Sequence, residues 1–122
     1  RKVAGIYNKK LSAIKNIELP FVAGAAKISW FVYAIKLAGK IEGKRDLLMK
    51  KLKERGIESR DYFQSIHLQP FYKKMFGYKK GDFPVTEGVS KKTLALPFFA
   101  NMKESQMDFV ITNLKDIIEK EI

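Results

Sequence analysis

Apolar residues recur at spacings of three and four in three long segments, the pattern of a helix that buries one face. These segments are Arg1 to Ile14, Lys44 to Arg55 and Ser105 to Lys120. The stripe of the last segment consists of Met107, Val110, Ile111, Leu114, Ile117 and Ile118. The second segment is followed by Gly56, a residue type that readily takes the left-handed conformation after a helix. The pattern therefore predicts three amphipathic helices.

The pattern changes to that of β-strands between these helices. Lys27 to Leu37 is rich in β-branched and aromatic residues on both alternating faces. This pattern predicts a strand that is covered on both sides, with one of the covers coming from outside this chain. Trp30 and Tyr33 are expected in the core or at a domain interface. Shorter strands are predicted around Ile57 to Arg60 and at Thr93 to Leu96.

The segment between the two shorter strands is less regular. Asp61 to Gly81 is interpreted as a long aromatic loop, and loops of this length in a compact domain are typical of functional sites. A further helix is predicted from near Pro84 to Lys92, with Asp82 as its N-cap. Helices alternating with few strands predict an α+β fold: a small antiparallel or mixed sheet of about three strands flanked by helices.

Composition limits the functional classes. The net charge of +11 raises the possibility of a basic module that binds nucleic acid or another polyanion. No RNP, KH, helix-turn-helix or zinc-finger pattern supports it, and lysines on the outer faces of helices explain the charge more simply. The chain has no cysteine and one histidine, His67, so no metal site is predicted. The apolar stretch from Leu19 to Gly39 is interrupted by Lys27 near its middle, which disfavours a membrane span.

Five segments occur in an order that resembles a known enzyme family. They read RKVAGIYNKKL (1–11), SWFVYAI (29–35), RDYFQSIHLQPFY (60–72), GDFPVTE (81–87) and TLALP (93–97). Together they resemble the C-terminal part of the nucleotide-sugar aminotransferases, fold-type I enzymes dependent on pyridoxal 5′-phosphate (PLP), often called the DegT/DnrJ/StrS family. The resemblance extends over essentially the whole chain.

The resemblance implies that the full-length protein is a PLP-dependent enzyme. It would transfer an amino group, usually from glutamate, to a keto-sugar attached to a nucleotide, in the biosynthesis of cell-surface polysaccharides or amino sugars. Members work as homodimers, and a cytoplasmic location is expected. Residues 1–122 would be the single small C-terminal domain that closes one side of the active site. The large PLP-binding domain would lie outside this chain, which begins at Arg1 in mid-helix, as expected of a fragment.

The sequence also departs from the family pattern. The segment S-F-x-x-x-K, which carries the PLP lysine, has no match here. The fragment alone is therefore expected to bind no PLP, to contain no catalytic residue and to be inactive. Phe31 stands where many members have histidine.

The candidate substrate-binding residues lie between Arg60 and Tyr72. Arg60 can donate two parallel hydrogen bonds to a diphosphate. Tyr62 offers a flat ring with a hydroxyl, and His67 and Gln69 offer hydrogen bonds to a sugar. Alternatives remain for three of them. Arg60 could be a surface charge or pair with Glu58 or Asp61, and His67 could instead fix the loop by a hydrogen bond. One of Tyr62 and Phe63 belongs to the core in the interpretation of the sequence, and the other lies near the site. At the level of the protein, the alternatives are the basic module and a degenerate family relative that serves as a scaffold.

Overall fold

A four-stranded antiparallel sheet forms the centre of the computed structural model, which describes residues 1–122. The strands are β1 (Ile17–Glu18), β2 (Tyr33–Leu37), β3 (Arg60–Asp61) and β4 (Thr93–Leu96), arranged in the order β1-β2-β4-β3. The predicted α+β class is confirmed, as is the strand Thr93–Leu96. The fourth strand, β1, was not predicted, because two residues are too few to show alternation.

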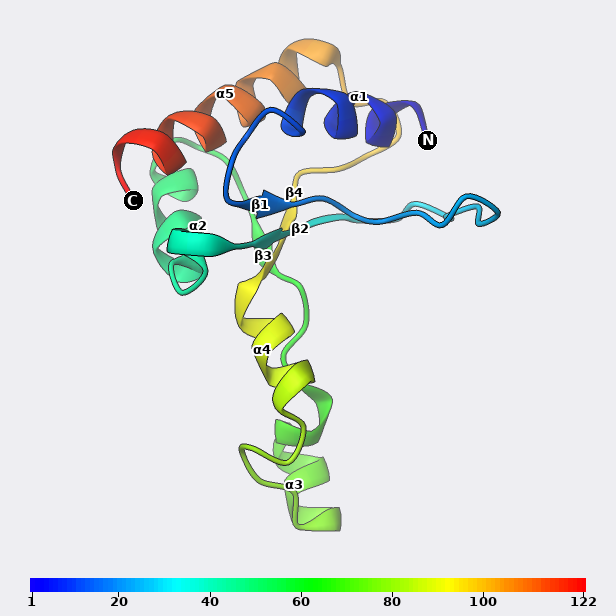
Figure 1. Ribbon diagram of the computed structural model, residues 1–122, viewed down its shortest axis with the longest axis vertical. Helices are drawn as coiled ribbons and strands as arrows, with labels where there is room; N and C mark the ends of the chain where they lie inside the picture. The colour runs from blue at the N-terminus through cyan, green and yellow to red at the C-terminus, as the bar shows by residue number, and fades with distance from the viewer.

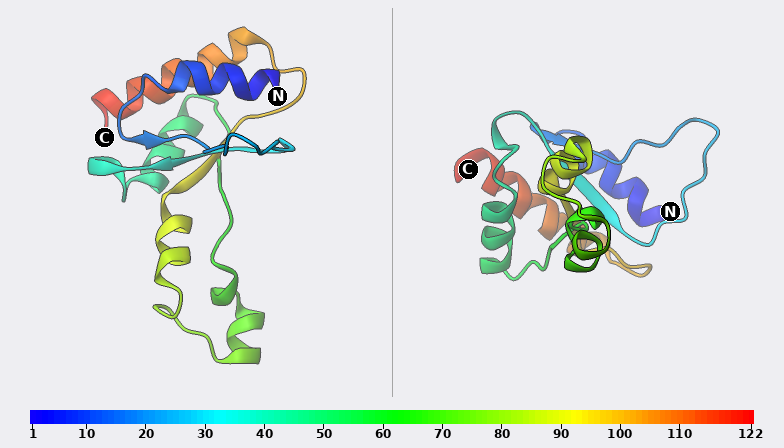
Figure 2. Two further views of the ribbon diagram at one scale, coloured as in Figure 1. Left: turned by 45° about the vertical axis from the view of Figure 1, so that its right-hand side comes forward. Right: turned by 90° about the horizontal axis from the view of Figure 1, so that it is seen from below.

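Three helices complete a body around one apolar core. Helices α1 (Lys2–Leu11) and α5 (Glu104–Lys120) lie side by side along one side of the sheet, and α2 (Arg45–Glu54) lies next to the C-terminal part of α5 (Figures 1 and 2). All three helices were predicted. The largest fully buried side chains come from every layer: Tyr7, Leu11, Tyr33, Ile35, Leu37, Ile41, Leu48, Leu52, Leu94, Met107, Leu114 and Ile117.

The end of α2 follows the predicted stop signal. Gly56 has φ +74°, and its N–H donates to the carbonyl of Lys53 at 2.9 Å. The N–H of Ile57 donates to the carbonyl of Leu52 at 2.9 Å, and the Ile57 side chain is buried. These two bonds form a Schellman motif, which directs the chain back towards the sheet.

The predicted strand Lys27–Leu37 is shorter in the structure, where only Tyr33–Leu37 is a strand. Its neighbour β4 ends at Leu96, opposite Tyr33, and Pro97 beyond it has no N–H to continue the ladder. On the other side, β1 ends at Glu18, and Pro20 follows closely. Residues 19–32 therefore have no strand to pair with, and they form the long loop that leaves the sheet in Figure 1.

The two faces of β2 also differ from the prediction. Tyr33, Ile35 and Leu37 are buried, whereas Ala34 and Lys36 on the other face are only partly covered by this chain. Strict alternation along the predicted strand would place Trp30 and Tyr33, three residues apart, on opposite faces. In the structure Trp30 stacks on Tyr33 with ring centroids 5.7 Å apart. The alternation fails there because residue 30 lies outside the strand.

Residues 62–92 form an arm that projects from the sheet between β3 and β4 (Figures 1 and 2). It contains the 3₁₀ turn η2 (Ile66–Leu68), helix α3 (Pro70–Phe76) and helix α4 (Pro84–Lys92). The interpretation of residues 61–81 as an irregular loop was wrong, because it missed α3. Helix α4 was predicted, but Asp82 does not cap it: its carboxylate accepts the Lys79 N–H at 2.9 Å. None of the helices combines the length and apolar character needed to cross a bilayer.

Candidate functional site

The candidate residue Arg60 lies on the edge strand β3. Arg60 pairs with Ala95 of β4, and the N–H of Tyr62 still donates to the carbonyl of Thr93 at 3.4 Å. Phe63 then takes a positive φ of 58°, a conformation that bulky residues rarely adopt. Strained backbone of this kind tends to occur at functional sites. The turn at Phe63 ends the strand and begins the arm.

An open depression of about 560 Å³ lies at this root of the arm. It is lined by Arg60, Asp61, Phe63, Gln64, Ile66 and Gln69. The structure therefore brings two of the predicted residues, Arg60 and Gln69, to one hollow. The volume is in the range of small-molecule sites.

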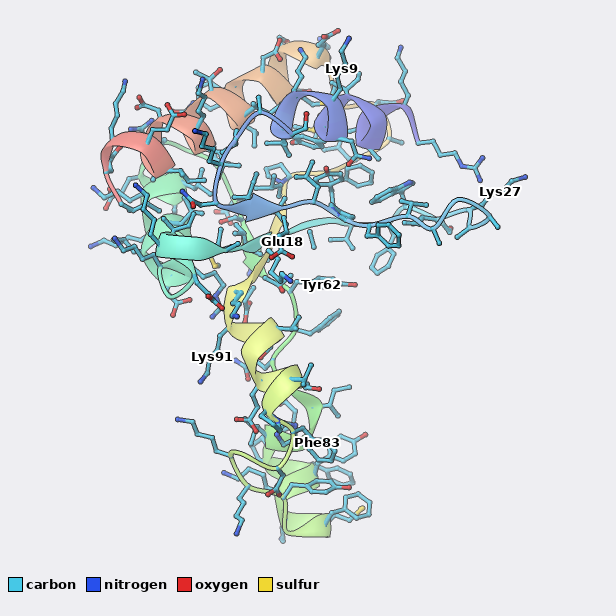
Figure 3. The ribbon with its side chains drawn as sticks, viewed as in Figure 1. Lys9, Glu18, Lys27, Tyr62, Phe83 and Lys91 are labelled. Carbon is cyan, nitrogen blue, oxygen red and sulfur yellow. The ribbon has the colours of Figure 1, made fainter.

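The side chains around this hollow are available to a ligand. Arg60 forms no ion pair within the chain, so the alternative pairing with Glu58 or Asp61 is not seen. The side chain of Gln69 makes only a long contact of 3.5 Å, to Gln64. Tyr62, labelled in Figure 3, does not line the hollow, but its ring centroid lies 5.0 Å from that of Phe63, which does.

His67 lies in the interior of the arm. It is only 7% exposed, and its Nε2 lies 3.0 Å from Oε1 of Glu87 on α4. The same carboxylate oxygen accepts the N–H of Gly81 at 2.7 Å. The loop-fixing hydrogen bond considered for His67 is therefore present, and Glu87 joins η2, α4 and the loop before α4.

These contacts keep the Glu87 carboxylate ionised. The Gly81 N–H and then the His67 side chain hold the pKa of the Glu87 carboxyl below its ordinary value of 4.5, against the opposing effect of burial. Glu87 is therefore ionised at neutral pH and can only accept hydrogen bonds. The proton between the two side chains must sit on Nε2 of His67, and Nδ1 makes no hydrogen bond within the chain.

A second pocket, of about 380 Å³, opens beside His67. Aromatic rings form most of its wall, and its lining consists of Ile66, His67, Tyr72, Phe76, Tyr78, Phe83 and Thr86. The Phe83 ring, labelled in Figure 3, has its centroid 4.8 Å from that of His67. The pocket thus joins a wide apolar surface to one imidazole, an arrangement suited to a flat ring or the apolar face of a sugar.

Sequence reasoning missed several members of this site. Glu87 belongs to the segment GDFPVTE but carried no predicted role, since only its distance from His67 reveals one. Helix α3, which supplies Tyr72 and Phe76, carried a readable signal: Pro70 at its first position and Gly77, with φ +71°, just after its end. Another hollow, of about 420 Å³ between α5 and residues 56–58, contains none of the predicted residues.

The positive charge is spread over the helices. Several lysines and arginines pair with carboxylates at the surface: Lys10, Lys36, Lys51, Arg55, Lys92, Lys115 and Lys120. No three His, Asp or Glu side chains come together as a metal site would require.

Comparison with known proteins relates this chain to a family. The sequence model of the DegT/DnrJ/EryC1/StrS aminotransferase family matches residues 1–115. The chain is 32% identical over 120 residues to the spore coat polysaccharide biosynthesis protein SpsC of Bacillus subtilis, covering 97% of this chain and 31% of SpsC. It thus spans about a third of the length of this relative.

Solved structures show the same fold. The putative sugar aminotransferase Spr1654 of Streptococcus pneumoniae, in its PMP form, superposes with a TM-score of 0.89 at 19% identity, covering 99% of this chain and 30% of Spr1654. DesV of S. venezuelae superposes with a TM-score of 0.86 at 24% identity, covering 99% of this chain and 31% of DesV. The extent of the sequence match and the shared fold together show that the chain belongs to the DegT/DnrJ/EryC1/StrS aminotransferase family.

Proposed function

We propose that this chain is the small C-terminal domain of a PLP-dependent sugar aminotransferase. The whole protein transfers an amino group from glutamate to a nucleotide-linked keto-sugar, in cytoplasmic biosynthesis of a surface polysaccharide or an amino sugar. Family membership over residues 1–115 is the observation that carries this proposal. It is supported by the names of the relatives, since SpsC is described as a polysaccharide biosynthesis protein and Spr1654 as a putative sugar aminotransferase.

The substrate-binding part of the proposal rests on the root of the arm. The unpaired guanidinium of Arg60 binds the diphosphate of the nucleotide-sugar, where two parallel hydrogen bonds fix its orientation. Tyr62 and Gln69 hydrogen-bond the sugar, and His67 contributes through Nδ1, its unbonded ring nitrogen. No acid–base pair for the chemical step is assigned to this chain.

The residues of this chain do not fit the site of the cofactor itself. None of its lysines is buried, and none lines the hollow at Arg60 or the aromatic pocket. The lysine that binds PLP is therefore assigned to the part of the protein outside these residues. Because the cofactor supplies the electron sink for amino transfer, the share of this chain is to bind and orient the substrate. A second subunit completes the active site in this proposal.

The test uses the polypeptide from the complete reading frame. We expect borohydride reduction of the PLP-loaded protein to fix a pyridoxyl group on one lysine outside residues 1–122, located by peptide mass mapping. We also expect amino transfer from glutamate to a nucleotide-linked keto-sugar. A folded protein that takes up no PLP would overturn the proposal and leave the scaffold alternative. Retention on duplex DNA at low salt, weakening steeply as salt rises, would support the polyanion alternative.

A further inference from the structure

The only buried residues of the arm are polar, and each of the three takes part in a side-chain hydrogen bond. Between residues 62 and 92, the buried side chains are Ser65, His67 and Glu87. Ser65 shares a hydrogen bond of 3.0 Å with Ser90, and His67 shares one of 3.0 Å with Glu87. Buried polar groups are costly unless they are satisfied, so this interior holds its shape only while the bonds are made.

Glu87 occupies the centre of this interior. Its side chain is 8% exposed, and one oxygen accepts from both the Gly81 N–H and His67 Nε2. Removing the carboxylate would leave the Gly81 N–H and the imidazole without a partner at once. It would also free the imidazole to rotate or to carry its proton on Nδ1 instead.

The consequence for His67 is chemical as well as mechanical. As long as Glu87 accepts from Nε2, a neutral imidazole presents Nδ1 as a hydrogen-bond acceptor. His67 lines the aromatic pocket, and Phe83 and Tyr78 pack on its ring with centroids 4.8 Å and 6.3 Å away. The ring is thus held by a carboxylate at one nitrogen and by aromatic neighbours at its face and edge.

We infer that Glu87 is a positioning residue for substrate binding: it fixes His67 with its proton on Nε2, so that Nδ1 accepts a hydrogen bond from a hydroxyl or imide N–H of the nucleotide-sugar in the aromatic pocket. This inference rests on the proposed function. Glu87 itself does not touch the substrate. We expect its effect to fall on the sugar substrate, because the pocket that His67 lines is the one assigned to that substrate.

The experiment uses the full-length, PLP-loaded protein and separates the two substrates. The KM for a nucleotide-linked keto-sugar is measured in steady state, and donation by glutamate is followed as 2-oxoglutarate formed in a single turnover without the sugar. For Glu87→Ala we expect a keto-sugar KM roughly tenfold higher, the change that one lost hydrogen bond corresponds to, with the glutamate turnover unchanged. Glu87→Gln keeps an accepting oxygen and is expected to restore most of the affinity.

His67→Gln distinguishes positioning from general damage. Its amide still donates to Glu87, so hydrogen exchange of the arm should stay as in the wild type, but the Nδ1 acceptor is lost and the KM should rise as in Glu87→Ala. Combining the two changes should add little, because both remove the same contact. Glu119→Gln, a matched change at a half-exposed site on α5, should leave every measurement unchanged.

Several outcomes would overturn the inference. A keto-sugar KM in His67→Gln equal to that of the wild type would show that Nδ1 is not used. If Glu87→Ala also speeds hydrogen exchange of the β4 amides, that variant is damaged as a whole, and the KM of His67→Gln then decides the question. Additive effects of the two changes would show that the residues act separately, and an equal fall in both half-reactions would show general damage. A wild-type protein that aminates no keto-sugar would overturn the proposed function and this inference with it. An active wild type with an unchanged Glu87→Ala variant would overturn the inference alone.

Discussion

The body and the arm of this chain are stabilised in different ways. The body buries a cluster of twenty apolar residues drawn from its helices, the sheet and the segments that connect them. The arm buries only polar side chains, while its large apolar residues lie outside: Phe63, Ile66, Phe71, Tyr72, Met75, Phe76, Phe83, Val85 and Val89. The body is therefore held mainly by removal of apolar area from water, which does not depend on pH. The interior of the arm is held by a few hydrogen bonds, one of which depends on the charge of Glu87. Four measurements test this contrast, from the largest expected effect to the smallest.

The core of the body should show the largest effect. Leu114 of α5 is fully buried, so Leu114→Ala should lower the free energy of unfolding by about 3 kcal/mol through lost burial and a cavity. Hydrogen exchange of the β4 amides in the full-length protein measures this loss. Leu47→Ala, at a 41% exposed position of α2, is the matched control and should have little effect. Similar losses at the two positions would contradict the assignment of the core.

Acid should open the arm before the body. The folded-state pKa of Glu87 lies below its ordinary value of 4.5, so its ionised form stabilises the arm fully above pH 4.5. That contribution is lost as the pH falls through the lower, folded-state value. The titratable and charged groups near Glu87 are His67 and, around the polar hollow on its other side, Arg45, Asp61 and Lys91.

Exchange of the α4 amides, corrected for intrinsic rates, should therefore rise below pH 4.5, while exchange of β2 stays slow. Asp116 and Glu121 also have pKa values lowered by basic neighbours, but their partly exposed surface pairs contribute little to the body. Glu87→Gln should abolish the acid-dependent step in the arm. Simultaneous opening of arm and body would show that they are one cooperative unit.

One hydrogen bond inside the body should matter less than the core. The Tyr7 hydroxyl donates to the carbonyl of Pro97 at 2.8 Å, and burial raises the pKa of Tyr7, so it stays neutral. Tyr7→Phe keeps the ring and should lower the free energy of unfolding by about 1 kcal/mol. Thermal unfolding measures the shift. No change in stability would mean that Pro97 finds another donor.

The exposed face of the arm should be the least sensitive. Met75 of α3 is 57% exposed, so Met75→Ser should change the free energy of unfolding by less than about 0.5 kcal/mol. Denaturant unfolding of the full-length protein measures this change in the free energy of unfolding, and Leu114→Ala serves as the reference for a large loss. A loss comparable to that of a core residue would show that α3 is covered elsewhere in the whole protein.

The same contrast explains what could be predicted from the sequence. The three amphipathic helices were found because each places a stripe of apolar residues on one face, and the Gly56 stop was found because its conformation is local. The length of β2 could not be predicted, because it depends on where β1 and β4 end. Helix α3 was missed although Phe71, Tyr72, Met75 and Phe76 recur at helical spacing, because seven residues make only two turns and give a short pattern.

The candidate site was predictable only in part. The segment 60–72 could be chosen from its residue types and its resemblance to the family, and the structure brings Arg60 and Gln69 of that segment to one hollow. Glu87 could not be chosen, because it meets His67 across twenty residues of chain that fold back as the arm. The sequence alone does not distinguish a glutamate that faces solvent from one that binds an imidazole.

The brevity of the outer strands has a consequence for assembly. β1 and β3 have two residues each, so the sheet presents almost no free ladder of N–H and carbonyl groups at either edge. A foreign strand therefore finds no template for adding to the sheet, and edge-to-edge aggregation is disfavoured. Any stable association of this chain must use its helices, its loops or the arm, and so depends on side chains that selection can tune individually.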